Sequence, residues 1–335
     1  MEELRDNVTA TPTSFVVVEY RGRAHELLLK HESLNPTGSI KDRTATGLLL
    51  DIDRLKPLVP GTVVIESTSG NLGLALARLV RQIDCHFIAV VDARTPQPTR
   101  DALTESGVEL RSVDEPDGQG GYLLSRLRTV RELCLAHPGH RWPNQYHNRA
   151  NPLIHERTTG PEIVRQGGPE LDTVYVAVST GGTLAGISAH LRAVAPGIRI
   201  VAVDSTGSLV TGGTGGRRLI AGLGASRASS FLTPASYDAA ARVPPEATVA
   251  ACRAFHEDTG IRLGGSSGSA LYSYLGDLTR RTPPRRALCV CPDGGQKYLG
   301  TVYDDAWLDS TSLTAAVADV TRRLREDGLR FHVEV

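Results

Sequence analysis

The chain has 335 residues, which is enough for two domains that each bury a hydrophobic core. Its 37 Lys and Arg residues balance 37 Asp and Glu residues, so net charge attracts neither nucleic acid nor an anionic membrane surface. No apolar run approaches the roughly 20 residues that span a bilayer, and the acidic, polar start of the sequence lacks the apolar stretch of a signal peptide. We therefore expect a cytoplasmic protein whose partners are small molecules.

Short apolar, β-branched runs bounded by polar turns predict buried strands, and stretches with helical spacing lie between them. The strands are TVVIE from residue 62, HFIAVV from 86, VYVAV from 174, IRIVAVD from 198 and RALCVC from 286. The helices are LGLALARLVRQ from 72, GYLLSRLRTVRELCLA from 121 and LAGISAHLRAVA from 184. This alternation predicts an α/β protein with mainly parallel sheets that are covered on both faces. The glycine-rich segment 211–218 predicts a mobile surface loop.

The cysteines form no CxxC pair, so neither a disulfide framework nor a zinc ribbon is indicated. They are Cys85, Cys134, Cys252, Cys289 and Cys291. Buried, unreactive thiols are the simplest interpretation. The CVC stretch at 289–291 places two thiols on one face of a predicted strand, which is too few ligands for a metal site.

Three polar loops could carry chemistry. NPTGSIKDRTA, residues 35–45, sets one lysine, Lys41, among small and polar residues where a helix is predicted to begin. ESTSGNLG, residues 66–73, could hold a carboxylate with its hydroxyls, its amide and its backbone donors, although a helix cap explains it equally well.

The third loop, STGGT at residues 179–183, follows a predicted strand and opens a predicted helix. A glycine-rich turn at a helix N-terminus offers free N–H donors to a phosphate, while a tight turn with a hydroxyl cap is an equal alternative. The patterns GxGxxG and GxxxxGK[ST] are absent, so a dinucleotide is disfavoured.

A lysine, a phosphate cradle and a carboxylate cradle on one α/β scaffold are what a pyridoxal phosphate (PLP) enzyme requires. In this order the motifs resemble the fold-type II PLP family of cysteine synthases and cystathionine β-synthases. The resemblance covers about residues 10–305 and includes NQYHNRANPLIHERTTGPEI from 144, GLG from 222, GGSSGSA from 264 and PDGGQKYL from 292. It implies a tryptophan synthase β-like fold, with a smaller, mobile domain of residues 40–150 and a larger domain of residues 1–39 and 151–335. PLP would lie in the cleft between them.

The resemblance also implies roles for individual residues. Lys41 would be the Schiff-base lysine and would move the Cα proton, and Asn71 would bind the 3′ oxygen of PLP. The 5′-phosphate would be held by Ser179, Thr180, Gly181, Gly182 and Thr183. The substrate carboxylate would be held by Thr68, Ser69, Asn71 and Gln145.

Two positions depart from the family pattern. Gly294 stands where relatives commonly carry a serine that meets the pyridine nitrogen, which leaves Ser266, Ser267, a water molecule or no partner at all as alternatives. Leu72 stands where threonine is common, and its backbone N–H could still bind the carboxylate.

Segments 118–133 and 201–227 are most similar to one branch, the N-(2-amino-2-carboxyethyl)-L-glutamate synthases of 2,3-diaminopropionate biosynthesis for siderophores and antibiotics. That branch implies O-phospho-L-serine as first substrate and L-glutamate as amine nucleophile. Arg126, Tyr146 and Ser179 would contact the substrate phosphate, unless Arg126 is a solvated helix arginine. Arg218 and Arg227 are candidates for the glutamate carboxylates, and each could equally be a surface charge.

Other interpretations stay open at this point. One is a cysteine or cystathionine synthase that joins O-acetylserine, O-phosphoserine or serine to a sulfur nucleophile. Another is a cofactor-binding regulator that does not turn over. The family resemblance further implies a homodimer.

Overall fold

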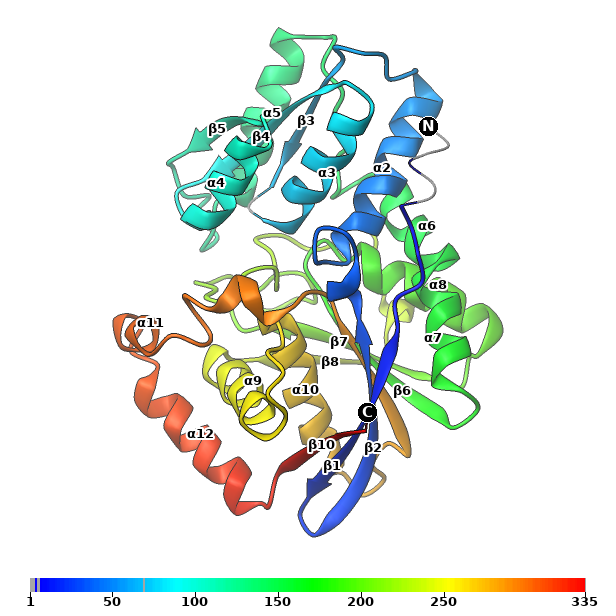
Figure 1. Cartoon of the computed structure of the whole chain (residues 1–335), viewed down its shortest axis with the longest axis vertical. Coiled ribbons are helices and arrows are strands. Elements are labelled where there is room, and N and C mark those ends of the chain that lie inside the picture. The colour runs from blue at the N-terminus through cyan, green and yellow to red at the C-terminus, as the bar shows by residue number, and fades with distance from the viewer. Residues whose placement is uncertain (1–3, 5–6, 69, 335) are drawn as a thin grey trace.

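The computed structural model describes Leu4, residues 7–68 and residues 70–334. Two sheets organise the chain into a small lobe and a large lobe, which lie above and below the middle of Figure 1. The small lobe carries a three-stranded sheet and the large lobe a seven-stranded one.

The small sheet is parallel throughout, in the order β3-β4-β5. Its strands are β3 (Val63–Ser67), β4 (His86–Asp92) and β5 (Glu109–Val113). The helices of this part of the chain are α2 (Lys41–Leu55), α3 (Asn71–Gln82), α4 (Gln97–Glu105) and α5 (Leu123–Ala136). One hydrophobic cluster packs α2 and α3 against the sheet, and a second joins its other face to α5.

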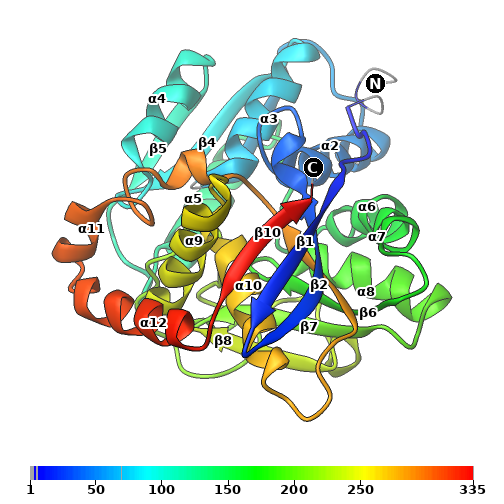
Figure 2. The same ribbon diagram turned by 60° about the horizontal axis from the view of Figure 1, so that its bottom comes forward.

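The large sheet has the order β10-β1-β2-β9-β6-β7-β8; β1 pairs in antiparallel fashion with both β10 and β2, and the other pairs are parallel. Figure 2 shows β10, β1 and β2 side by side at this edge. The strands are β1 (Thr13–Tyr20), β2 (Arg23–His31), β6 (Leu171–Ala177), β7 (Arg199–Ser205), β8 (Ala239–Val243), β9 (Arg286–Cys291) and β10 (Arg330–Glu334). The predicted α/β class with mainly parallel sheets is confirmed.

Helices cover both faces of the large sheet, as the continuous apolar strands require. They are α6 (Ala150–Arg157), α7 (Thr159–Gly167), α8 (Gly182–Val194), α9 (Pro245–Thr259), α10 (Gly265–Leu278), α11 (Asp305–Ser310) and α12 (Thr314–Glu326). Strand β9 shows the alternation, because Cys289 and Cys291 belong to the cluster with α9 and α10, whereas Leu288 and Val290 belong to the cluster with α8.

The thiols behave as the sequence predicts. Burial raises the pKa of Cys252 and of Cys291 to about 12, which keeps both thiols protonated. Cys85 and Cys289 are also buried, and Cys134 is half-buried. In the described part of the chain, no three His, Cys, Asp or Glu side chains are grouped to hold a metal ion.

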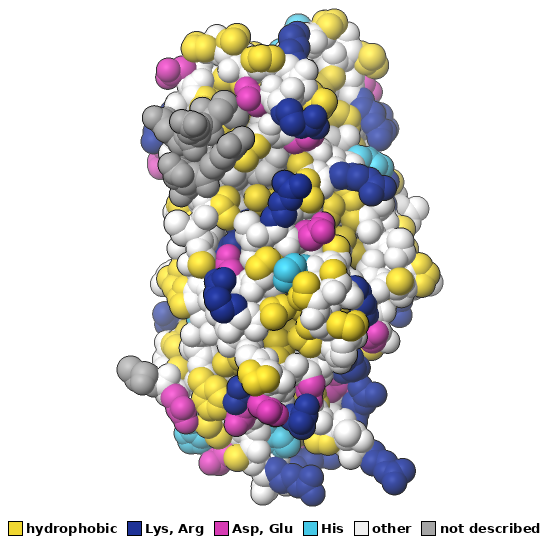
Figure 3. Space-filling view, turned by 90° about the vertical axis from the view of Figure 1, so that its right-hand side faces the viewer, with side chains coloured by type: hydrophobic (Ala, Val, Ile, Leu, Met, Phe, Trp, Pro, Cys, Tyr) yellow, Lys and Arg dark blue, Asp and Glu magenta, His cyan; other side chains and the backbone are white. Residues whose placement is uncertain are grey.

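The face of the molecule in Figure 3 carries charged side chains of both signs. In Figure 3, Lys and Arg side chains alternate with Asp and Glu side chains over the face that is shown. Among the described residues, no helix is both long enough and apolar enough to cross a bilayer. Residues 211–218 form neither helix nor strand.

Candidate active site

A cavity of about 520 Å³ opens between the lobes, where strands of both sheets end. Lining residues follow the carboxyl ends of β3 (Thr68), β4 (Asp92), β6 (Ser179) and β9 (Asp293). Ligands of α/β proteins collect at this edge, because the loops after parallel strands converge there. A cavity of this size lies within the roughly 300–1,000 Å³ that is typical of small-molecule sites.

Lys41 is the first residue of α2, and its side chain lines the cavity. The start of α2 is joined to the end of β9, because the N–H of Ile40 donates to the carbonyl of Pro292 at 2.8 Å and Ser39 pairs with Asp293. Within the described residues, Lys41 Nζ makes no hydrogen bond. The amine is therefore held in place by its backbone and left available to a ligand.

A buried ion cluster holds the first turn of α2. Arg43 Nε lies 2.8 Å from Glu32 Oε2, and Arg43 Nη1 lies 2.7 Å from Glu162 Oε1. Lys30 Nζ lies 2.6 Å from a Glu162 oxygen and also donates to Thr11. Removing one partner would leave an uncompensated buried charge, so this cluster fixes the helix that carries Lys41 to the large lobe.

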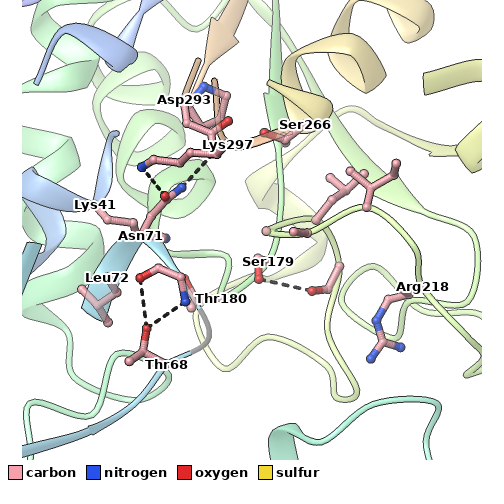
Figure 4. A pocket seen from close by; sticks show the side chains of 18 of the residues that line it. Lys41, Thr68, Asn71, Leu72, Ser179, Thr180, Arg218, Ser266, Asp293 and Lys297 are labelled. Atoms are coloured by element: carbon pink, nitrogen blue, oxygen red, sulfur yellow. Dashed lines mark hydrogen bonds between the residues drawn. The ribbon is translucent and has the colours of Figure 1, made fainter. Parts of the chain in front are cut away.

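The predicted phosphate cradle lies at the N-terminus of α8. Gly181 has φ +87°, and an added Cβ would lie 2.2 Å from Ser229 Oγ, so only glycine fits there. Ser179 Oγ donates to the Gly224 carbonyl at 3.2 Å (Figure 4). Thr180 Oγ1 accepts from the N–H of Gly182 at 3.2 Å.

Four of the five predicted cradle residues line the cavity: Ser179, Thr180, Gly181 and Thr183. Gly182 begins α8 but lies behind them, where an added Cβ would collide with the Asn151 side chain. Thr183 Oγ1 lies 3.3 Å from Nε2 of the buried His155. The cradle thus combines a helix N-terminus with hydroxyl groups that the protein holds in place.

The predicted carboxylate loop begins α3. Thr68 Oγ1 accepts from the N–H of Gly73 at 2.9 Å, so this hydroxyl caps the helix as well as lining the cavity. Leu72 lines the cavity too. Gln145 is buried against the loop and donates to the Ser67 carbonyl at 2.8 Å. Ser69 lies outside the described residues.

Asn71 is held between two charged residues that the sequence analysis did not single out. Its Nδ2 donates to Asp293 Oδ2 at 2.7 Å, and its Oδ1 accepts from Lys297 Nζ at 2.5 Å (Figure 4). Both partners belong to the PDGGQKYL motif, which was the available signal. The Asn71 amide therefore links α3 of the small lobe to the loop after β9 in the large lobe.

Arg126 on α5 is 8 % exposed, so the alternative of a solvated helix arginine is wrong. Its Nε lies 3.2 Å from Asp92 Oδ2, and both side chains line the cavity with Tyr146 and Ser179. Burial raises the pKa of Tyr146, while the nearby Arg126 lowers it. The structure thus brings the three predicted phosphate contacts, Arg126, Tyr146 and Ser179, to one cavity.

The residues considered as partners of the pyridine nitrogen differ in whether they line the cavity. Ser266, at the start of α10, lines the cavity, whereas Ser267 and Gly294 do not. Ser267 is 1 % exposed, and its Oγ is close enough to Cys291 to affect that thiol. Of these residues, Ser266 is in position to meet a ligand in the cavity.

The cavity is rich in cationic side chains. Lys41, Arg94, Arg126, Arg217, Arg218 and Lys297 line it, against the two carboxylates of Asp92 and Asp293. Arg227, the other arginine proposed from the sequence, is not among the lining residues. Such an excess favours ligands that carry several negative charges.

Residues 5–293 match the model of the family described as "Pyridoxal-phosphate dependent enzyme". The chain belongs to this family. Its similarity to the N-(2-amino-2-carboxyethyl)-L-glutamate synthase of Ralstonia nicotianae is 39 % identity over 90 % of each chain. The chain is 36 % identical to the synthase of the same name from Cupriavidus metallidurans, and the match covers 89 % of each chain. The crystal structure of O-ureido-L-serine synthase superposes with a TM-score of 0.81 at 27 % identity, covering 91 % of this chain and 98 % of that one.

The family and its cofactor, both predicted from the sequence, are confirmed by these comparisons. The cavity of this PLP-dependent enzyme also fits the group physically. It offers an amine without a hydrogen-bond partner, a helix N-terminus for a phosphate and Ser266 on a second helix N-terminus. The excess of cationic side chains matches a doubly charged phosphate.

The pKa of Lys41 leads to a test of pH dependence. Burial lowers this pKa from its ordinary value of 10.5 to about 8, although Asp293 opposes the shift. Only the neutral amine attacks an aldehyde, so uptake of PLP by cofactor-free protein should accelerate as pH rises to about 8 and level off above it. Stopped-flow absorbance between pH 6 and 10 measures this rate. A rate that keeps rising to pH 10 would show an unshifted lysine.

Proposed function

We propose that this enzyme replaces the phosphate of O-phospho-L-serine with the amine of L-glutamate, giving N-(2-amino-2-carboxyethyl)-L-glutamate and phosphate. The main structural support is Arg126, a buried cation in the cavity with Tyr146 and Ser179. Negative charge develops on a departing phosphate, and a fixed cation or donor stabilises that charge. The names of the relatives, at 39 % and 36 % identity, support the same reaction.

Bound PLP supplies an electron sink for the carbon that loses and regains a proton. In our proposal, the start of α8 and the hydroxyls of Ser179 and Thr180 hold the cofactor phosphate. Lys41 anchors the cofactor and carries the proton to and from the Cα of the substrate. Asn71 binds the 3′ oxygen of the cofactor in this proposal, as the family resemblance implies, and its amide is oriented by hydrogen bonds to Asp293 and Lys297.

The remaining residues act on the substrates. Thr68, Asn71 and Gln145 hold the carboxylate of O-phosphoserine, with Ser69 completing this loop. Arg126 and Tyr146 hold the phosphate as the carbon–oxygen bond breaks; after the phosphate has left, the glutamate amine forms the new carbon–nitrogen bond at the same carbon. We further propose that residues 40–150 close as a mobile domain over the large lobe, which excludes water from the reacting atoms.

Mass spectrometry of the products tests this proposal. O-phosphoserine with glutamate should give N-(2-amino-2-carboxyethyl)-L-glutamate together with an equal amount of phosphate. The control pairs O-phosphoserine, O-acetylserine or serine with sulfide or homocysteine. Products from the sulfur nucleophiles alone would instead identify a cysteine or cystathionine synthase, and no phosphate release at all would leave a cofactor-binding regulator.

Three wider proposals accompany this reaction. We propose that the enzyme is a homodimer, that it works in the cytoplasm, and that its product enters 2,3-diaminopropionate biosynthesis for a siderophore or an antibiotic. Light scattering of the purified protein would test the first of these directly.

A further inference from the structure

Two exposed arginines at the cavity have no acidic partner among the residues that the structure describes. Arg94 follows β4 in the small lobe, and Arg217 belongs to the loop between β7 and β8 in the large lobe. Both line the cavity, and within the described residues neither lies within 4.0 Å of a carboxylate. By contrast, the buried Arg126 is paired with Asp92 at 3.2 Å. Arg94 and Arg217 therefore present charges that no carboxylate of the described residues neutralises to an anion that enters from solvent.

The backbone segments beside these two arginines lie close together. Arg94 Nη1 donates to the Gly120 carbonyl at 3.0 Å, and its guanidinium lies 5.3 Å from the centre of the Tyr122 ring. A Cβ added to Gly120 would lie 2.1 Å from the Gly216 oxygen and 2.9 Å from the Arg217 nitrogen. The loop of Arg217 thus touches the segment that holds Arg94, across the boundary between the lobes.

Arg218, the neighbouring residue, has a different environment. Its Nη1 donates to the carbonyls of Gln119, Gly207 and Gly216, and its Nη2 donates to Ser226 Oγ at 2.7 Å. Most of its donors are therefore used to hold the two loops together. In Figure 4, Arg218 lies across Ser179 from Lys41, so this arginine region lies on the far side of the cavity from the reactive amine.

We infer that Arg94 and Arg217 bind a carboxylate of the incoming amine and so select a dicarboxylic nucleophile. This inference rests on the proposed function and names the residues that recognise its second substrate, L-glutamate. When the amine of glutamate is at the reacting carbon, the Cα that bears this amine lies next to it. The side-chain carboxylate carbon is three bonds away from that Cα. That carboxylate points away from Lys41, toward exposed guanidinium groups, which bind carboxylates through paired N–H donors.

The kinetic test compares Arg94→Gln and Arg217→Gln with the unaltered enzyme. Each substitution should raise the KM for glutamate about 10-fold while kcat and the KM for O-phosphoserine change little, because one charge-assisted contact is lost. The preference for glutamate over glutamine should fall by a similar factor. Arg131→Gln is the matched control, since Arg131 is exposed on α5 and lies outside the cavity. An unchanged KM for glutamate in both variants would overturn the inference.

A binding measurement separates this inference from the proposed reaction. Glutarate has two carboxylates and no amine, so calorimetric titration of the PLP-loaded protein needs no turnover. Its affinity should fall about 10-fold in Arg94→Gln and Arg217→Gln, and should stay constant in Arg131→Gln. Equal affinities throughout, or a loss only in Arg227→Gln, would overturn the inference. If the unaltered enzyme binds glutarate through these arginines but makes no product from glutamate, only the proposed reaction fails.

Discussion

Replacing Lys41 with alanine should remove the visible absorbance of lysine-bound PLP and lower turnover at least about 10³-fold. The sequence contains four lysines, and their environments differ. Lys30 is buried in the ion cluster, Lys56 is exposed, and Lys297 is bound to Asn71. Lys41 alone of these four lines the cavity without a hydrogen bond on its amine. In our proposal, its loss removes both the anchor of the cofactor and the group that moves the Cα proton.

Lys56→Ala is the control, because Lys56 lies just beyond the end of α2 and far along the helix from the cavity. It should keep the absorbance and the activity. Absorbance spectra and steady-state rates of the purified proteins decide the matter. Should the absorbance survive in Lys41→Ala and disappear in Lys297→Ala, the anchoring lysine would be Lys297, and the assignment of Lys41 would be wrong.

Arg126→Ala should lower kcat/KM for O-phosphoserine by about 10²-fold, the effect of losing one preorganised charge contact to a leaving group. With O-acetylserine, whose leaving group lacks a phosphate, the loss should be less than about 10-fold. Arg126 is buried beside Asp92, so alanine also leaves that carboxylate unpaired. Arg126→Lys keeps a charge but loses the planar donor pair. Its kcat/KM for O-phosphoserine should therefore lie between the values of the unaltered enzyme and of Arg126→Ala.

Arg128→Ala is the matched control on the same helix, since Arg128 is exposed and lies outside the cavity. Its rates with both substrates should equal those of the unaltered enzyme. An equal loss with O-phosphoserine and O-acetylserine in Arg126→Ala would contradict a phosphate role and point to general damage of the site. The ratio of the two kcat/KM values is thus the decisive measurement.

The strands that escaped prediction have identifiable causes. β5, β8 and β10 all lie at the edge of a sheet, where polar residues interrupt the apolar pattern, as in ELRSV of β5. The β1–β2 hairpin turns at Arg21 and Gly22, both with positive φ. Arginine rarely adopts that conformation, so the pair gives no turn signal of the Asn-Gly kind. Strands β3, β4, β6, β7 and β9 and three helices were predicted because their burial produces strong apolar patterns.

The residues of the candidate site also fall into a group that could be predicted from the sequence and a group that could not. Lys41, the STGGT turn and the ESTSGNLG loop could be found from the sequence, because each needs particular residues over a few consecutive positions, such as Gly181 at φ +87°. The roles of Asp293 and Lys297 could not be found this way. They meet Asn71 across 222 and 226 residues of sequence, and no local pattern reports such a contact.

The sequence by itself determined the alternation of strands and helices, and its motifs indicated the family, the cofactor and candidate loops for binding it. The alternation follows from periodicity, whereas the family and the cofactor follow from the resemblance of short motifs, and both signals act over short stretches of chain. Only the tertiary structure decided that Arg126 is buried, that Ser266 and not Ser267 faces the cavity, and that the Arg217 backbone lies beside Gly120, to which Arg94 donates a hydrogen bond. Such facts depend on how distant loops pack at the ends of two sheets, because burial and charge pairing are properties of the folded whole.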